Sequence, residues 1–196
     1  MQEQSCGRND IVSASFSIHP MSDDFIDIIL GALEEVDTSN VWSKTDDVST
    51  SVRGTSAHVF DVTKALFMHA AKTGKHVAFQ ATYSCGCPGG SCEDANLEVG
   101  DIPVNNEKIK DTKQYVAAKF SLYPLGGGNY MDLIYQQIEA MKAFVTVSSA
   151  PLATRLEGEA IQVFNGLEKV FNATVEGGSS HNVMTVSISA NSPSHN

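Results

Sequence analysis

The feature that most constrains the fold of this chain is an internal repeat. The stretch FSIHPM begins at Phe16, and FSLYPL begins at Phe120, which is 104 residues later (120 − 16). Further on, SAHVFDVTKALFMHAA is matched by EAIQVFNGLEKVFNA, and HVAFQATYSCGCP is matched by HNVMTVSISANSP. Only two units exist, which excludes a solenoid of many repeats. We therefore expect the chain to fold as two similar units.

Each copy predicts the same order of elements. After the first strand, SDDFIDIILGALEEV and GGGNYMDLIYQQIEAMKAF carry apolar residues at helical spacing, with Ser22 and Asn129 as the expected N-caps. Two short β-like runs follow in each copy: VWSKT and VSTSVRG in the first, FVTVSS and LATRLEG in the second. A helix and a last strand complete a βαββαβ unit. The sequence thus predicts an α+β fold of tandem ferredoxin-like repeats, with antiparallel sheets and helices on one face.

The chain divides naturally between the two copies. We expect residues 10–90 to form ferredoxin-like repeat 1 and residues 114–194 to form repeat 2. The stretch between the copies, CGCPGGSCEDANLEVGDIPVNNEKIKDTKQ, is rich in Gly, Asn and charge, so we expect residues 91–113 to be a linker. The composition, 42% hydrophobic and 18% charged, is that of an ordinary globular protein.

Charge and hydrophobicity exclude several classes of protein. The net charge of −10 repels phosphate backbones, so we expect no nucleic-acid partner. No stretch reaches the roughly 18 consecutive apolar residues of a membrane span, so we expect no membrane insertion. The first residues, MQEQSCGRND, lack the apolar core of a signal peptide. The sequence therefore predicts a cytoplasmic protein.

Strand alternation predicts a helix-free sheet face that is rich in hydroxyl groups. In VSASFSIH, the residues Val12, Ala14, Phe16 and Ile18 point toward the helices, and the serines and a histidine point away. Small hydroxyl residues allow another sheet to pack closely, between the two copies or across a dimer. They also suit a hollow that holds a small polar molecule. The two uses are compatible, and the residues alone do not choose between them.

The candidate ligand-binding residues are the outward-facing residues together with those at the strand turns: Ser17, His19, Thr45, Asp46, Ser49, Ser51, Arg53, Ser84, Ser121, Tyr123, Thr154, Ser187 and Ser189. Thr154 alternates inward and is kept only because the register there could slip by one residue. Outward differences between the copies, such as His19 against Tyr123, predict that two pockets would not bind equally. Asp46 and Asp47 suit a cationic or amino-bearing ligand, although a turn needs no such role for them.

Motifs of catalysis and of metal binding are absent from the sequence. There is no G-x-S-x-G elbow, P-loop, H-E-x-x-H or dinucleotide fingerprint, so we predict no catalytic residue and no cofactor. Cys85, Cys87 and Cys92 have the spacing C-x-C-x4-C, which matches no usual structural zinc site. We predict free thiols in a Gly-rich turn, with a metal or redox role as the weaker alternative.

Four stretches, FSIHPMSDDFIDII, VWSKTDDVSTSVRG, HVFDVTKALFMHAA and SISANSPS, resemble the YkoF family of thiamin/hydroxymethylpyrimidine-binding proteins. The resemblance covers nearly the whole chain. It implies homodimers that bind thiamin or its pyrimidine half without catalysis, one pocket per repeat. It also implies a role in thiamin-precursor uptake or salvage, linked to an ABC-type transporter. The segment CGCPGGSC contains more cysteine than the resemblance leads us to expect.

Two other classes of function remain open at the level of sequence. An ACT-like regulatory module would sense an amino acid or another small metabolite at a repeat or dimer interface. An enzyme on the same scaffold would convert the compound that it binds. A panel of ligands separates the first class from thiamin binding, and recovery of unchanged ligand separates the second.

Overall fold

The computed structural model describes residues 11–86, 100–125 and 129–195. Repeat 1 contains β1 (Val12–Pro20), α1 (Phe25–Glu35), β2 (Trp42–Thr45), β3 (Thr50–Gly54), α2 (Ser56–Ala71) and β4 (Val77–Cys85). A short helix, α3 (Asn106–Ile109), precedes repeat 2. Repeat 2 contains β5 (Tyr115–Leu125), α4 (Tyr130–Met141), β6 (Thr146–Ala150), β7 (Ala153–Glu159), α5 (Ala160–Glu176) and β8 (His181–Ala190), followed by the 3-10 turn η2 (Pro193–His195). The predicted βαββαβ order therefore occurs twice.

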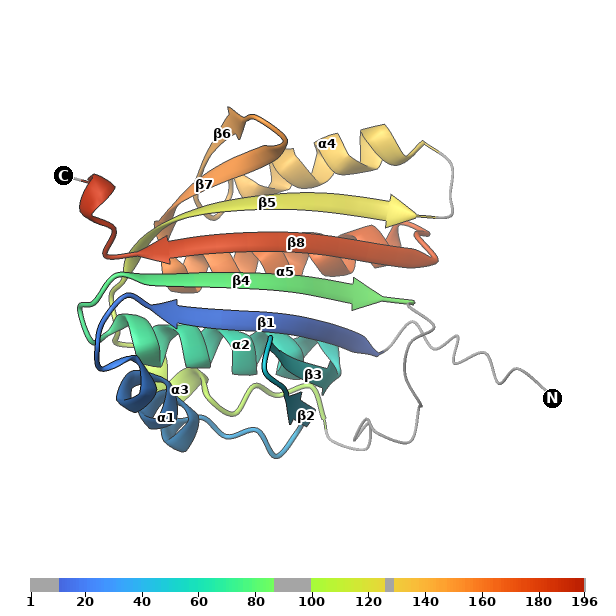
Figure 1. Ribbon diagram of the computed structural model, residues 1–196. Helices are drawn as coiled ribbons and strands as arrows, with labels where there is room; N and C mark the ends of the chain where they lie inside the picture. The colour runs from blue at the N-terminus through green and yellow to red at the C-terminus, as the bar shows by residue number, and fades with distance from the viewer. Residues whose placement is uncertain (1–10, 87–99, 126–128, 196) are drawn as a thin grey trace.

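The eight strands form one antiparallel sheet in the order β2-β3-β1-β4-β8-β5-β7-β6 (Figure 1). The sequence predicted antiparallel sheets, and the structure joins those of the two repeats through β4 and β8. Within one chain the repeats thus meet edge to edge. Face-to-face packing of the two copies of one chain, one of the two ways in which the hydroxyl-rich face could meet another sheet, is therefore wrong; packing across a dimer stays a prediction.

The pairing of β4 with β8 is symmetric. His76 and His181 begin the last part of each repeat and are 105 residues apart (181 − 76). Ala81 pairs with Val186, which is its own equivalent 105 residues later. Because the pairing is centred on equivalent positions, an approximate twofold axis passes through this pair and relates the two repeats.

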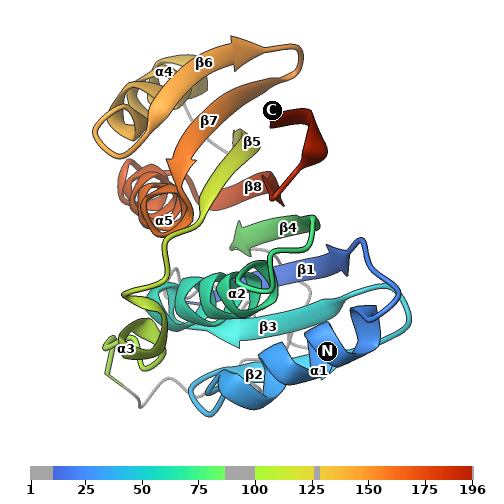
Figure 2. The same cartoon turned by 90° about the vertical axis from the view of Figure 1, so that its left-hand side faces the viewer.

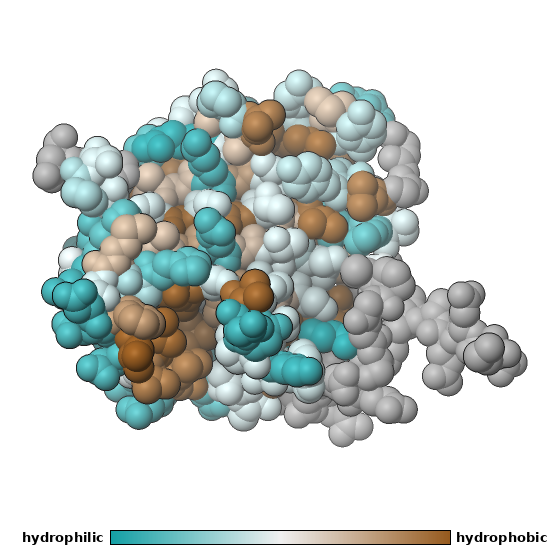
Figure 3. All heavy atoms as spheres, viewed as in Figure 1, coloured by the Kyte–Doolittle hydropathy of each residue, from teal (hydrophilic) through white to brown (hydrophobic). Residues whose placement is uncertain are grey.

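The long helices of the described residues, α1, α2, α4 and α5, lie on one side of the sheet. Figure 2 shows α2 and α5 next to each other to the left of the central strands, with α4 near one edge of the sheet and α1 near the other. The opposite face of the sheet has no helix over it. Figure 3 views this helix-free face: neutral and hydrophilic residues cover most of the strands, with scattered hydrophobic ones among them, and the largest group of strongly hydrophobic residues lies at the lower left, over α1.

Burial along the strands follows the predicted alternation. In β1, Val12, Ala14 and Phe16 are buried, while Ser15 and His19 are exposed. In β4 and β8 the inward residues are likewise buried and the hydroxyl residues face away. The alternation held because one face of each strand packs on helices and the other does not.

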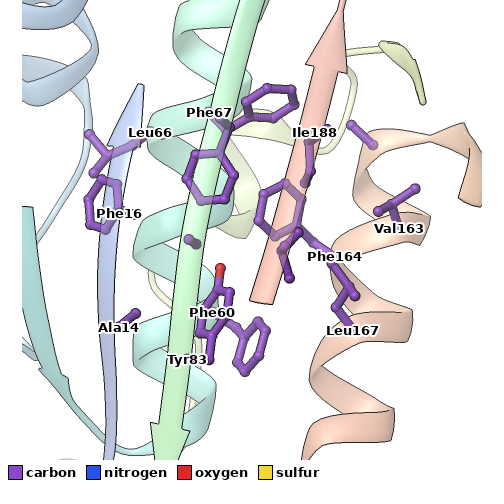
Figure 4. Packing of buried hydrophobic residues seen from close by; sticks show 14 of the residues in the cluster. Ala14, Phe16, Phe60, Leu66, Phe67, Tyr83, Val163, Phe164, Leu167 and Ile188 are labelled. Carbon is purple, nitrogen blue, oxygen red and sulfur yellow. The ribbon is translucent and has the colours of Figure 1, made fainter. Parts of the chain in front are cut away.

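A continuous core runs across both repeats (Figure 4). Phe60 of α2 stacks on Tyr83 of β4 with ring centroids 4.3 Å apart. Phe79 of β4 meets Phe164 of α5 at 5.7 Å. Since Phe79 belongs to repeat 1 and Phe164 to repeat 2, the two units share one core instead of packing as separate bodies.

Two helix starts differ from the predictions. The residue at the N-cap of α1 is Asp24, and Ser22 lies two residues earlier, where its hydroxyl accepts a hydrogen bond from the Asp24 amide at 3.3 Å. Asn129 does occupy the N-cap of α4, but its side-chain amide donates to Asp132 instead of capping a backbone amide. Among the described helices, none is long and apolar enough to cross a membrane.

Candidate functional site

A pocket of about 220 Å³ lies in repeat 1, between α1, the end of β1 and the β2–β3 turn. Its walls include the apolar side chains Phe16, Ile18, Ile29, Ala32, Leu33, Leu66 and Ala70. Its rim carries the polar residues Ser17, His19, Thr45, Asp46, Asp47, Ser49 and Thr50. Apolar walls with a few polar groups at one end are typical of a site for a small ring-containing ligand.

The Asp46 carboxylate holds the β2–β3 turn together. One of its oxygens, Oδ1, accepts hydrogen bonds from the amides of Val48 at 2.8 Å and Ser49 at 2.9 Å. Both hydrogen bonds lower the pKa of the Asp46 carboxyl, and the bond from the Ser49 amide has the larger effect. The carboxylate is therefore ionised at neutral pH. The predicted ligand residue Asp46 therefore shapes the rim of the pocket through its turn.

Asp47 is the second carboxylate of this rim. It is exposed and lines the pocket, and the structure gives its side chain no hydrogen bond to the other described residues. A carboxylate in this position has acceptor capacity for a ligand donor or a ligand cation. Of the two acids in the turn, Asp47 is thus the better placed to meet a ligand directly.

Two threonines line the same end of the pocket. Thr45 and Thr50 pair across β2 and β3, and their hydroxyls are 3.0 Å apart. Thr50 also pairs with Phe16, so both threonines lie on the helix side of the sheet. Their hydroxyls therefore belong to the pocket and not to the helix-free face.

The serines beside the pocket are already engaged in hydrogen bonds. The Ser17 hydroxyl donates to the backbone carbonyl of Val48 at 3.0 Å. The Ser15 hydroxyl donates to the side-chain hydroxyl of Ser49 at 3.0 Å. These bonds tie β1 to the β2–β3 turn. The oxygen lone pairs of these serines stay available as acceptors, while their protons serve the turn.

The structure brings some of the sequence-predicted residues together and separates others. Five of them line the pocket: Ser17, His19, Thr45, Asp46 and Ser49. Seven others lie on the helix-free face away from this pocket: Ser51, Arg53, Ser84, Ser121, Tyr123, Ser187 and Ser189. A second hollow of about 260 Å³ on that face is lined by Ser17, Ser49, Gln80, Thr82 and Ser187, among others. A hollow on the helix-free face, one of the two uses that the sequence left open for its hydroxyl residues, therefore occurs in the structure.

The register of β7 does not slip. Thr154 pairs with Phe120 of β5, so it stays on the helix side, as Thr50 does in repeat 1. The suggestion that Thr154 turns outward is therefore wrong.

Sequence reasoning missed the apolar wall of the pocket. Ile29 and Leu33 belong to the apolar stripe that helical spacing predicts, but that spacing did not place them at a pocket, and Ala32 is the only residue of α1 that is buried. Phe25, Ile26, Leu30 and Leu33 are about half exposed. The sequence did carry a signal for this wall. As a helix, FIDIILGAL has apolar residues around more of its surface than a single stripe packed on the core requires.

Repeat 2 presents different chemistry at the equivalent positions. Ala150-Pro151 replace Asp46-Asp47 in the turn, which removes both carboxylates. Gln137, which is buried, stands where α1 has Ala32. The hydrogen bond to the turn is kept, because Ser121 donates to the carbonyl of Leu152 at 3.0 Å. The scaffold thus repeats while the rim and floor change.

The described residues contain one of the four cysteines, Cys85. Cys85 is buried in β4, so it does not lie in a Gly-rich turn. Cys6, Cys87 and Cys92 fall outside the described residues. Within the described ranges, no group of three or more His, Cys, Asp or Glu side chains could hold a metal ion.

Comparison with known sequences identifies the family. A sequence model described as "YKOF-related Family" matches residues 11–90 and 115–195. The chain belongs to the YKOF-related family. A member of this family from Bacillus subtilis (strain 168), named "Putative HMP/thiamine-binding protein YkoF", is 43% identical over 193 residues, which are 98% of this chain and 96% of that protein. The predicted family and tandem α+β fold are thus confirmed.

Two solved structures show weaker similarity to this YKOF-related chain. A hypothetical protein from Methanocaldococcus jannascii is 22% identical over 38% of this chain and 78% of its own, with a TM-score of 0.36. The domain of unknown function DUF77 from Bacillus cereus is 19% identical over 39% of this chain and 75% of its own, with a TM-score of 0.31.

Proposed function

We propose that this chain binds thiamin or its hydroxymethylpyrimidine moiety without converting it. The observation that carries the proposal is the repeat 1 pocket, which has apolar walls and the carboxylate of Asp47 at its rim. Thiamin joins a flat aminopyrimidine to a permanently cationic ring. The apolar walls suit the flat ring, and the carboxylate suits an amino group or the positive charge. The name of the Bacillus subtilis relative supports the same class of ligand.

The size of the pocket favours the pyrimidine half as the enclosed part. At about 220 Å³ it is smaller than the roughly 300–1,000 Å³ typical of sites that enclose a drug-sized ligand. We therefore place the aminopyrimidine between α1 and the threonines. The remainder of thiamin would extend past the exposed Val48 and Asp47.

One pocket per repeat remains part of the proposal, with unequal affinities. The repeat 2 site lacks both turn carboxylates and carries Gln137 in place of Ala32. A cationic ligand loses its counter-charge there, and the larger side chain takes up space. Repeat 1 should therefore bind thiamin more tightly than repeat 2.

The wider role follows the resemblance of the chain to its family. We place the protein in thiamin-precursor uptake or salvage in the cytoplasm, functionally linked to an ABC-type transporter, and we expect a homodimer. Support for a second copy comes from the helix-free face of the eight-stranded sheet, which no helix of the described structure covers. Hollows on that face would remain as cavities between the copies. Sedimentation of the full chain at about twice its 21.0 kDa mass would support the dimer.

Calorimetric titration tests the function directly. Thiamin and hydroxymethylpyrimidine should bind saturably, with a Kd on the order of micromolar, equivalent to about −8 kcal/mol. Asp47→Asn should weaken thiamin binding about tenfold or more, because it removes a charge-assisted contact. Asp111→Asn, an exposed acid far along the chain, is the matched control and should stay within about twofold.

The two ligands also report what Asp47 contacts. Equal losses for both would assign the carboxylate to the pyrimidine amino group, which the ligands share. A loss confined to thiamin would assign it to the cationic ring. Saturable binding of amino acids alone would favour the ACT-like alternative. Chemical change of thiamin, seen by mass spectrometry after incubation, would favour an enzyme.

A further inference from the structure

A row of polar side chains crosses the helix-free face through the centre of the sheet. Gln80 of β4 pairs with Ser187 of β8, and Ser187 pairs with Lys119 of β5. Lys119 in turn pairs with Arg155 of β7. Because directly paired residues of an antiparallel sheet share a face and lie about 4.5–5.5 Å apart at Cβ, the two cations are neighbours.

Two like charges in direct opposition destabilise a sheet unless something compensates them. The chain has only 13 Lys and Arg residues against 23 Asp and Glu, so two adjacent cations are not expected from its composition. Glu157 provides part of the compensation, since its carboxylate accepts a hydrogen bond from the Arg155 guanidinium at 2.9 Å. A guanidinium has five N–H donors, so this contact orients Arg155 and leaves donor capacity for another partner.

The cation pair borders a hollow of about 480 Å³. Ala78 and Ala117 are the small residues that make room in it, and the hydroxyl residues Ser187, Ser189, Ser192 and Ser194 surround it. The last two come from the segment that follows β8. The hollow thus combines two positive charges with several hydroxyl donors in a volume typical of ligand sites.

The internal repeat shows that the scaffold does not require these cations. The positions equivalent to Lys119 and Arg155 in repeat 1, which lie 104 residues earlier, are Ser15 and Ser51. Those two serines pair across β1 and β3 in the same way. The same fold is therefore built with two hydroxyls, and the charges in repeat 2 are an addition to it.

We propose that Lys119 and Arg155 form an anion site for a phosphate group, carried by inorganic phosphate or by a small phosphate monoester. Arg155 supplies a planar fork that matches phosphate oxygens, Lys119 supplies a point charge, and the serines donate to the remaining oxygens. The site is distinct from the repeat 1 pocket. Ser17, which lines that pocket, pairs with Gln80, so Lys119 lies three strands away, about 14 Å at the usual strand spacing. The proposal does not depend on the proposed function.

The test uses inorganic phosphate and phenyl phosphate as probes, titrated calorimetrically into the full chain at low ionic strength, where screening is weak. Both should bind saturably at one site per chain. Lys119→Ser and Arg155→Ser install the residues of repeat 1 at equivalent positions, and each should weaken phosphate binding about tenfold. Phenyl phosphate should bind more tightly than inorganic phosphate if the organic group occupies the hollow, and equally if only the anion is held.

Lys44→Ser is the matched control. Lys44 lies on the same face, opposite Ser51 in repeat 1, and its loss should change phosphate affinity less than about twofold. Thermal unfolding, measured on all three variants, reports whether the fold is intact. The absence of saturable binding by either probe would overturn the proposal, as would equal losses in all three variants. Variants that alter the sedimenting mass without altering phosphate binding would assign the cations to a contact between copies, and would also overturn it.

Discussion

At the scale of single residues, Ala32 decides how deep the repeat 1 pocket is. Its methyl group lies in the pocket wall, and the equivalent residue of repeat 2 is the larger Gln137. Ala32→Gln should therefore weaken thiamin binding about tenfold or more, since the longer side chain takes the space of the ligand. Calorimetric titration of the variant measures this effect.

Gly31, the neighbouring residue, provides the control. A Cβ added at Gly31 would meet no other atom within 4 Å, and the residue lies inside α1. Gly31→Ala should raise the free energy of unfolding by about 0.5–1 kcal/mol, because glycine in a helix loses more backbone entropy on folding. Thiamin affinity should not change. If Gly31→Ala weakened binding as much as Ala32→Gln, the loss would come from the helix and not from the filled pocket.

Local pattern predicted the burial of individual strand residues but not their roles. Phe16 and Lys119 fall on the expected faces because a strand has a period of two and only one face is covered. The distinction between Asp46 and Asp47 depends on which carboxylate bonds the turn amides. That choice is made by the turn conformation, which two adjacent aspartates in a sequence do not reveal.

At the scale of elements, α2 and α5 meet through a group of partly and fully buried charges. Lys64 of α2 is 4% exposed and lies 3.5 Å from the Asn165 amide oxygen of α5. Burial raises the pKa of Glu168, on α5, to about 6. The positive charge of Lys64 opposes this increase, and the negative charge of Asp61 adds to it. We therefore expect the stability of the fold to depend on pH through Glu168.

Glu168→Gln tests this dependence. The folded pKa is above the unfolded value of 4.5, so the stability from the protonated group is present below pH 4.5 and is lost as pH rises through 6. At pH 8 the variant should be more stable than the natural protein by about 1–2 kcal/mol, and near pH 4.5 the two should be similar. Urea unfolding at both values measures the difference. A variant that is less stable at pH 8 would show that attraction to Lys64 outweighs the cost of burial.

The order of helices and strands could be predicted from the sequence, but the pairing of the edge strand of one repeat with that of the other could not. Helical spacing in the stretch after Phe16, and again after Phe120, is enough to give βαββαβ twice. The pairing of β4 with β8 has no local signal, because both strands simply alternate and either could have stayed an open edge. The wall that α1 forms was missed for a similar reason: helical spacing shows that a face is apolar, not what lies against it.

At the scale of the whole molecule, the junction of the repeats depends on a close approach just after β4. Gly86 has φ +80°, and a Cβ there would overlap the carbonyl oxygen of Ser180, next to the start of β8. Gly86→Ala should lower the free energy of unfolding by about 2–4 kcal/mol, from backbone strain and steric overlap together. Thermal or urea unfolding measures the loss.

Gly74→Ala separates the two causes. Gly74 has a similar φ of +76°, but a Cβ there would meet nothing within 4 Å. Gly74→Ala should therefore lower the free energy of unfolding by only about 1–2 kcal/mol, from backbone strain alone. Equal losses at the two positions would mean that the β4–β8 junction relaxes around the added methyl group without cost.

The near-twofold pairing at Ala81 and Val186 has a consequence for how such a molecule can evolve. In a symmetric assembly of identical half-length chains, every mutation would strike both halves at once, and neither binding chemistry could change alone. Here the halves are successive parts of one polypeptide, so each can acquire its own mutations while the shared sheet keeps their geometry alike. Aspartates at one turn with alanine and proline at the other, and serines at one crossing with cations at the other, are the divergence that such a fused duplication permits.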